Sequence, residues 1–153
     1  MSPDPVDIVR KLLENAADPD AITELVAEHA TYVSLNTEDE ELHRIMPWAG
    51  TKYGLQAFLD NLRDVFSFWT NEEWIVTDVF GQDERVAAFG TFVHRSNTLH
   101  KAVATPFSVF AKVVDGKIVY FQFQEDTFAT ARTFRSGGTW AIRADPDGEP
   151  FEI

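Results

Sequence analysis

The residues best suited to chemistry lie in one short segment, residues 117–126, which follows an Asp-Gly pair. Asp-Gly makes a tight turn, because Gly tolerates positive φ and Asp hydrogen-bonds to nearby backbone. Beyond the turn the side chains alternate with period two, as in a strand. One row ends in a carboxylate and comprises Val119, Phe121, Phe123 and Glu125. The pattern predicts an apolar pocket wall with one charge at its end; an ordinary half-buried strand with a charged exit is the alternative.

Glu125 is the candidate general acid or base. A carboxylate buried among aromatic rings has its pKa raised by desolvation, which suits proton transfer. A solvated Glu, or one paired with an Arg, is the alternative. His94 and His100 share the parity of their strand and are candidates for a proton relay with Glu125, and Tyr32 is a further candidate helper. Histidines exposed at a strand end are the alternative interpretation.

Two other histidines are weaker candidates for a role. His43, in the loop before Trp48, is a candidate to close over a ligand. His29 is expected to end the second helix, where a cation suits the helix dipole. No compact His/Asp/Glu spacing supplies about three convergent ligands, so we expect neither a metal nor another cofactor. The chain has no Cys, which excludes disulfides and thiolate chemistry.

Aromatic residues make up 13% of the chain and include 13 Phe and 4 Trp. Such residues fill cores or line apolar pockets, and we expect about half of the candidates to be core. The candidate ligand-binding residues are Trp48, Tyr53, Phe58, Trp69, Phe107, Val109, Phe121 and Phe123.

Charge and composition limit the partners. The formal net charge of −12 repels phosphate backbones and anionic lipid, so neither nucleic acid nor a membrane surface is expected as a partner. Residues 1–7 lack the apolar region of a signal peptide, and no apolar run approaches a membrane span. We therefore expect a cytoplasmic protein whose partner is a hydrophobic small molecule.

The elements that position these residues follow from hydrophobic periodicity and turn residues. Helical spacing predicts three helices, within residues 5–13, 19–26 and 55–69. Strand-like runs cover residues 30–36, 73–80, 85–95, 102–114 and 117–126. We expect a solvated acidic loop at 37–41, a Gly-rich loop at 47–54, a short helix at 127–135 and a tail at 136–153.

Helices followed by an antiparallel meander predict an α+β fold. Three N-terminal helices against one face of a curved sheet would enclose a cone with an apolar interior, open at one end. The other face is partly apolar, so we expect a homodimer to cover it. Residues 1–135 then form the single domain, and the tail is a candidate to lie across the partner subunit or the mouth of the cone.

This order of elements resembles the nuclear-transport-factor-like superfamily, which includes ketosteroid isomerases, SnoaL-like polyketide cyclases and limonene epoxide hydrolases. The matching motifs are residues 17–22 leading to Ala30-Thr31, residues 47–50 with Gly54, and Asp115-Gly116-Lys117-Ile118. The resemblance covers about residues 6–135. It implies a cystatin-like α+β roll and a bacterial member of the SnoaL-like, ketosteroid-isomerase-like branch.

The resemblance also implies positions for catalytic residues, and most of them are unsuitable here. The ketosteroid isomerase base falls near Ser34, with Tyr32 and Asn36 as alternatives in the register, and the partner residues fall near Val109 and Arg10. The Gln, His and Asp of the SnoaL-like cyclases fall at Phe107, Val109 and Phe123, which are all apolar. Two hypotheses remain: a lyase, isomerase or hydrolase that uses Glu125, and a non-catalytic binding protein or dimerising scaffold.

Overall fold

The chain opens with helices and ends with a meander of long strands, and the computed structural model describes residues 2–153. The helices are α1 (Pro5–Glu14), α2 (Pro19–Leu25), α3 (Glu40–Ile45), α4 (Leu55–Phe68), α5 (Thr127–Ala131) and the 3-10 turn η1 (Arg132–Phe134). The strands are β1 (Val26–Ser34), β2 (Gly50–Tyr53), β3 (Trp69–Gln82), β4 (Arg85–Ser96), β5 (Ala102–Val114), β6 (Lys117–Glu125), β7 (Ala141–Ile142) and β8 (Phe151–Glu152).

The first two helices begin in the same way, with an Asp cap followed by a Pro. Asp4 accepts a hydrogen bond from the backbone nitrogen of Val6 at 2.9 Å, and Asp18 accepts one from Asp20 at 3.0 Å. A Pro at the first helical position loses no hydrogen bond, because that nitrogen has no partner in a helix. Both helix starts therefore agree with the prediction from the sequence.

Six strands form one curved sheet in the order β2-β1-β6-β5-β4-β3. The neighbours are antiparallel except β1 and β6, which are parallel. The predicted meander of β3 to β6 is therefore confirmed. Asp115 and Gly116 join β5 to β6 with φ of 49° and 76°, the left-handed conformation that an Asp-Gly turn needs.

A β-bulge at Val119 corrects the predicted inner row of β6. Lys112 faces Tyr120 while Val113 faces Ile118, so Val119 has no partner on β5. The extra residue turns Ile118 into the core, where it is fully buried, and leaves Val119 half-buried. The inner row is therefore Ile118, Phe121, Phe123 and Glu125.

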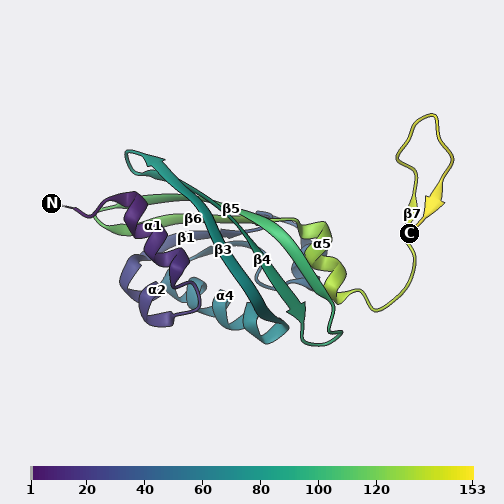
Figure 1. Ribbon diagram of the computed structural model, residues 1–153, viewed down its shortest axis with the longest axis horizontal. Helices are drawn as coiled ribbons and strands as arrows, with labels where there is room; N and C mark the ends of the chain where they lie inside the picture. Colours follow the sequence, from purple (N-terminus) through teal and green to yellow (C-terminus); the bar gives the residue numbers. More distant parts are fainter. Residues whose placement is uncertain (1) are drawn as a thin grey trace.

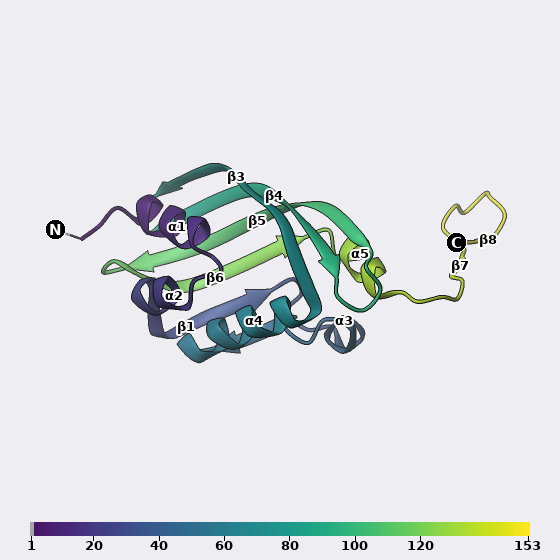
Figure 2. The same ribbon diagram turned by 60° about the horizontal axis from the view of Figure 1, so that its bottom comes forward.

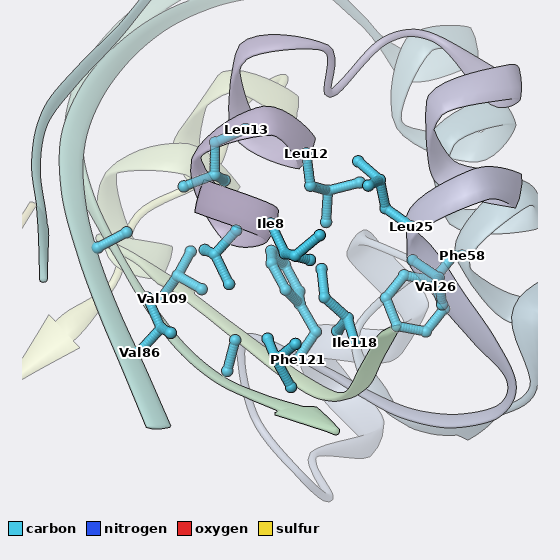
Figure 3. Close-up of a cluster of buried hydrophobic side chains, with 14 of the residues drawn as sticks. Ile8, Leu12, Leu13, Leu25, Val26, Phe58, Val86, Val109, Ile118 and Phe121 are labelled. Atoms are coloured by element: carbon cyan, nitrogen blue, oxygen red, sulfur yellow. The ribbon is translucent and has the colours of Figure 1, made fainter. Parts of the chain in front are cut away.

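The three longer helices pack on the concave face of the sheet (Figures 1 and 2). Figure 3 shows apolar side chains of α1, α2 and α4 converging on side chains from β4, β5 and β6. Burial of each large apolar side chain stabilises the fold by about 1.5–3 kcal/mol. A second apolar cluster, built around Trp48 and Trp69, lies against η1 through Phe134.

Three local predictions are wrong. The acidic loop at 37–41 runs into α3, which starts because Asp39 caps the backbone nitrogen of Leu42 at 2.9 Å. The Gly-rich loop contains β2, which pairs with β1. Strand β1 begins at Val26, which pairs with Ile118, so His29 lies in a strand rather than at a helix end. In the last two cases pairing with a distant strand overrides the local sequence signal.

The tail leaves the body after η1 and ends in a small hairpin, β7–β8, well apart from the sheet (Figures 1 and 2). Trp140 stacks on Phe128 with 5.6 Å between ring centroids, and the Arg135 side chain donates to the carbonyl oxygens of Gly138 and Ile153. None of the helices in residues 2–153 has the length and apolar character required to cross a membrane.

Candidate functional site

The concave face of the sheet, the α1–α2 connection and α4 enclose a cavity of about 480 Å³. Most of its walls are apolar, which favours an apolar ligand. Exposed polar residues Glu14, Asn15 and Asp18 line the cavity at the α1–α2 connection. Six further polar side chains line it from the sheet and α4. These are Tyr32, Ser34, Asn61, Asn71, His94 and Glu125.

Most of the predicted ligand-binding residues lie on these walls. The cavity is lined by Trp48, Phe58, Trp69, Phe121 and Phe123. Tyr53 does not line it: the residue is on the edge strand β2 and is 76% exposed. Phe107 and Val109 are buried in the core instead, and Trp74 of β3 stacks on Phe107 with 4.4 Å between ring centroids. Ligand binding by the five lining residues stays a prediction.

Glu125 lies at the end of β6 with its carboxylate turned into the cavity wall. Its Oε2 atom is fully enclosed and has no hydrogen-bond partner. Burial raises the pKa of Glu125 to about 7, the Thr130 side chain opposes the shift, and the charge of Asp126 adds to it. A carboxyl group with this pKa exists in both protonation states near neutral pH, as a general acid or base must.

Tyr32 and Asn61 form a polar pair beside Glu125. Asn61 Nδ2 donates a hydrogen bond to the Tyr32 hydroxyl oxygen at 3.0 Å, while Asn61 Oδ1 is enclosed without a partner. Burial raises the pKa of Tyr32 above its usual range; the Glu125 charge adds to this, and Ser34 and Asn61 oppose it. The phenol is therefore neutral, and Phe58 and Phe121 hold its ring at centroid distances of 4.6 and 5.8 Å.

His94 lies on another wall, on β4. Asn71 Nδ2 is 3.1 Å from His94 Nδ1, and the rings of Trp69 and Phe92 are 5.0 and 4.4 Å from the imidazole centroid. Burial lowers the pKa of His94 to about 4, and the Val93 backbone opposes the shift. The ring is therefore neutral at physiological pH.

The predicted histidine relay to Glu125 is not made. Within residues 2–153 no hydrogen bond joins His94 to Glu125. His100 sits in the β4–β5 turn with φ of 57° and does not line the cavity. His43 Nδ1 is 3.0 Å from the Ala49 carbonyl oxygen, also outside the lining. His43 lies in α3 rather than in the predicted loop, and His100 lies in the β4–β5 turn.

Sequence reasoning missed Asn61 and Asn71. Asn61 interrupts the apolar face of α4 that carries Phe58 and Val65, and a polar residue on such a face was a usable signal. Asn71 follows Trp69 at the start of β3, where nothing in the sequence distinguishes it from a solvated Asn. No group of three potential metal ligands occurs in the part of the chain that the structure describes.

The fold is an α+β cone with a partly polar cavity between its sheet and its helices. The chain belongs to the SnoaL-like domain family, whose sequence profile matches residues 9–121.

Two curated relatives and one solved structure are similar to this chain. Patulin synthesis protein F of Aspergillus clavatus is 42% identical over 137 residues, which are 86% of this chain and 69% of the relative. Patulin biosynthesis cluster protein F of Penicillium expansum is 39% identical over 150 residues, 94% of this chain and 75% of the relative. The crystal structure of an NTF2-like protein from Burkholderia thailandensis matches with a TM-score of 0.76 and 19% identity, covering 87% of this chain and 98% of that one.

These similarities confirm the predicted fold and the SnoaL-like, NTF2-like resemblance. The expectation of a bacterial member is not supported, because both curated relatives are fungal.

Proposed function

We propose that this protein is an isomerase- or cyclase-type enzyme that moves a proton on a small, largely apolar molecule, with Glu125 as the acid and base. The observation that carries the proposal is the enclosed, unpartnered Oε2 atom of Glu125 in the wall of the cavity. Burying an unpaired carboxyl group is costly, so its presence in a cavity wall favours a functional role.

The chemistry needs no cofactor. The ionised Glu125 takes a proton from an acidic C–H or O–H group of the substrate, and the electron pair stays on the substrate as an enolate or alkoxide. The protonated Glu125 then returns the proton at another atom, so the net reaction is an isomerisation or a ring closure. The neutral Tyr32 hydroxyl lies near this carboxyl group and would hold a polar group of the substrate, while Asn61 fixes the hydroxyl through its hydrogen bond.

The relatives support a biosynthetic role. Both carry names that refer to patulin synthesis, and each matches at least 86% of this chain. A cavity of about 480 Å³ with mostly apolar walls suits a small substrate.

A non-catalytic binding protein is the second candidate. The observation that favours it is the isolation of Glu125: within residues 2–153 no hydrogen bond joins it to another titratable side chain. A binding protein needs only a cavity of the right shape and one orienting contact, whereas an enzyme needs several groups around one reacting atom.

Solvent deuterium exchange tests the proposal without knowledge of the natural substrate. A panel of cyclic ketones and enones is incubated with the protein in D₂O, and exchange of acidic C–H groups is followed by proton NMR. We expect exchange with the wild type and a loss of about 10²–10⁴-fold in Glu125→Gln, which keeps the shape but cannot ionise. Equal exchange by both proteins contradicts a role for Glu125, and binding without exchange favours the binding protein.

We also propose a homodimer formed through the convex face of the sheet. This face exposes Ile75, Phe80, Phe89 and Phe110, and the rings of Phe80 and Phe89 stack with 5.9 Å between centroids. The four residues lie on three neighbouring strands, so their apolar surfaces are adjacent. Exposed apolar groups gathered in this way are typical of an interface between subunits.

A further inference from the structure

Asn71 determines which nitrogen of the His94 ring carries the proton. Asn71 Nδ2 lies 2.9 Å from the carbonyl oxygen of Glu73 and 3.1 Å from His94 Nδ1. A carbonyl oxygen can only accept a hydrogen bond, so the amide must present its NH₂ group to both atoms. The amide has two hydrogens, and after Glu73 the nearer acceptor is His94 Nδ1, because the Val93 carbonyl oxygen is 3.4 Å away. His94 Nδ1 therefore accepts the second hydrogen, and the proton of the neutral ring is on Nε2.

The Nε2–H group of His94 faces the cavity. Within residues 2–153 this nitrogen has no hydrogen-bond partner. It is also not among the fully enclosed unpaired side-chain atoms of these residues, which are Asn61 Oδ1 and Glu125 Oε2, so part of its surface is accessible. The accessible side of Nε2 is therefore the cavity that His94 lines. Close packing by Trp69 and Phe92 restricts rotation of the ring, and its lowered pKa keeps it neutral.

Glu125 and His94 line the cavity from different strands of the sheet. Glu125 is on β6, which is separated from the β4 strand of His94 by β5 alone. Two strand spacings are roughly 10 Å along the sheet, a span that a substituted ring can fill.

We propose that His94 Nε2–H binds a carbonyl oxygen of the substrate. The substrate class is then a small molecule that carries a carbonyl group. This inference rests on the proposed function and deepens it. When Glu125 removes a proton from the carbon beside the carbonyl, the electron pair moves to the carbonyl oxygen, where the His94 hydrogen bond stabilises it.

A matched pair of ligands tests the carbonyl contact by titration calorimetry. 4-Hydroxyacetophenone carries a phenolic hydroxyl and a carbonyl group, and 4-ethylphenol has a methylene group in place of the carbonyl. The preference is the ratio of the affinity for 4-hydroxyacetophenone to that for 4-ethylphenol. It should fall by about threefold to tenfold in His94→Phe, which keeps a stacking ring but has no N–H. His94→Gln restores a donor and should recover part of the preference. An unchanged preference in His94→Phe, or no binding of either compound by the wild type, would overturn the inference.

Nitrogen-15 NMR measures the proton position directly, without a ligand. The chain has four histidines, and the signals missing from His94→Phe identify His94. We expect its Nε2 to be protonated and its Nδ1 to be unprotonated at neutral pH; the reverse would overturn the inference even where a variant does not fold.

Repeating the ligand pair with Glu125→Gln separates the two proposals. If only the Glu125 role is wrong, the carbonyl preference persists without exchange activity. If only the His94 inference is wrong, Glu125-dependent exchange persists without the preference.

Discussion

Glu125 and His94 lie in the walls of one cavity, and burial moves their pKa values in opposite directions. In each case burial disfavours the charged form, which raises the pKa of an acid and lowers that of a base. At neutral pH the cavity therefore holds a neutral His94 that donates and a Glu125 poised between its two forms. This combination suits proton transfer next to a polarised carbonyl group.

Glu125→Gln should stabilise the protein at high pH. The pKa of Glu125 in the folded protein is about 7, above the ordinary value of 4.5. The stability that the protonated carboxyl group contributes is therefore fully present below pH 4.5 and is lost as the pH rises through 7. The difference in unfolding free energy between the variant and the wild type should therefore grow by on the order of 3 kcal/mol between pH 4.5 and 8. Urea unfolding at several pH values measures it; a difference that does not change with pH would show that the carboxylate is compensated.

His94→Phe should show the opposite pH dependence. The folded pKa of about 4 is below the ordinary 6.5, so the stability that the neutral ring contributes is present above pH 6.5 and is lost as the pH falls through 4. Relative to the wild type, the variant should gain on the order of 3 kcal/mol in unfolding free energy over this range. The same urea series checks this, with His100→Phe at an exposed turn as the control. A parallel course of wild type and variant would contradict the prediction.

At the scale of elements, β3, β4 and β5 pack closely around Gly90. Gly90 of β4 pairs with Phe107 of β5, whose ring lies over the glycine and stacks with Trp74. A Cβ atom at Gly90 would lie 2.5 Å from Phe107 Cε1 and closer still to the Ile75 carbonyl oxygen. The absence of a side chain at this position lets three strands curve around the interior.

Gly90→Ala should therefore destabilise the fold by at least about 2 kcal/mol, because the clash involves backbone as well as a packed ring. Thermal unfolding followed by circular dichroism measures the loss. Gly137→Ala is the matched control: its Cβ would meet no atom within 4 Å, so a change within about 0.5 kcal/mol is expected. Similar stabilities of the two variants would mean that β3 and β5 yield easily around Gly90.

At the scale of the whole molecule, the cavity and the convex face point in opposite directions from one sheet. The same alternation that turns Phe121 and Phe123 inward turns Phe89 and Phe110 outward on neighbouring strands. None of residues 136–153 lines the cavity between the sheet and the helices.

The proposed homodimer predicts that Phe89→Glu gives a monomer. A charge placed at the centre of an apolar interface must be desolvated without a partner, which opposes association. Light scattering after gel filtration measures the mass. Tyr53→Glu, at a more exposed aromatic position on the edge strand, should leave the dimer intact. A wild-type mass of one chain would rule out the interface.

Removal of the tail after Gly138 should leave the body folded. The ring contact of the removed residues with the body is Trp140 on Phe128, both about half exposed, and such a stack contributes about 0.5–1.5 kcal/mol. We expect a loss of unfolding free energy no larger than this and an unchanged mass in solution. A much larger loss, or dissociation, would show that the tail packs across a partner subunit.

The sequence determined the features that depend on neighbouring residues. Asp4 and Asp18 before prolines start α1 and α2, Asp115-Gly116 makes the β5–β6 turn, and alternation after the turn places Phe121 and Glu125 on one row. These signals are short-range, so they can be recognised without knowing what the segment contacts. Together with the order of elements they sufficed for the α+β cone and for Glu125 as the candidate acid or base.

The tertiary structure decided what depends on contacts between distant segments. The bulge at Val119 arises from pairing with β5, and Phe107 became core because Trp74 covers it. Asn61 and Asn71 gained roles only when folding brought them to Tyr32 and His94, 29 and 23 residues away in the sequence. Hydrogen-bond partners, strand register and desolvation are set by these long-range approaches, which local residue patterns do not encode.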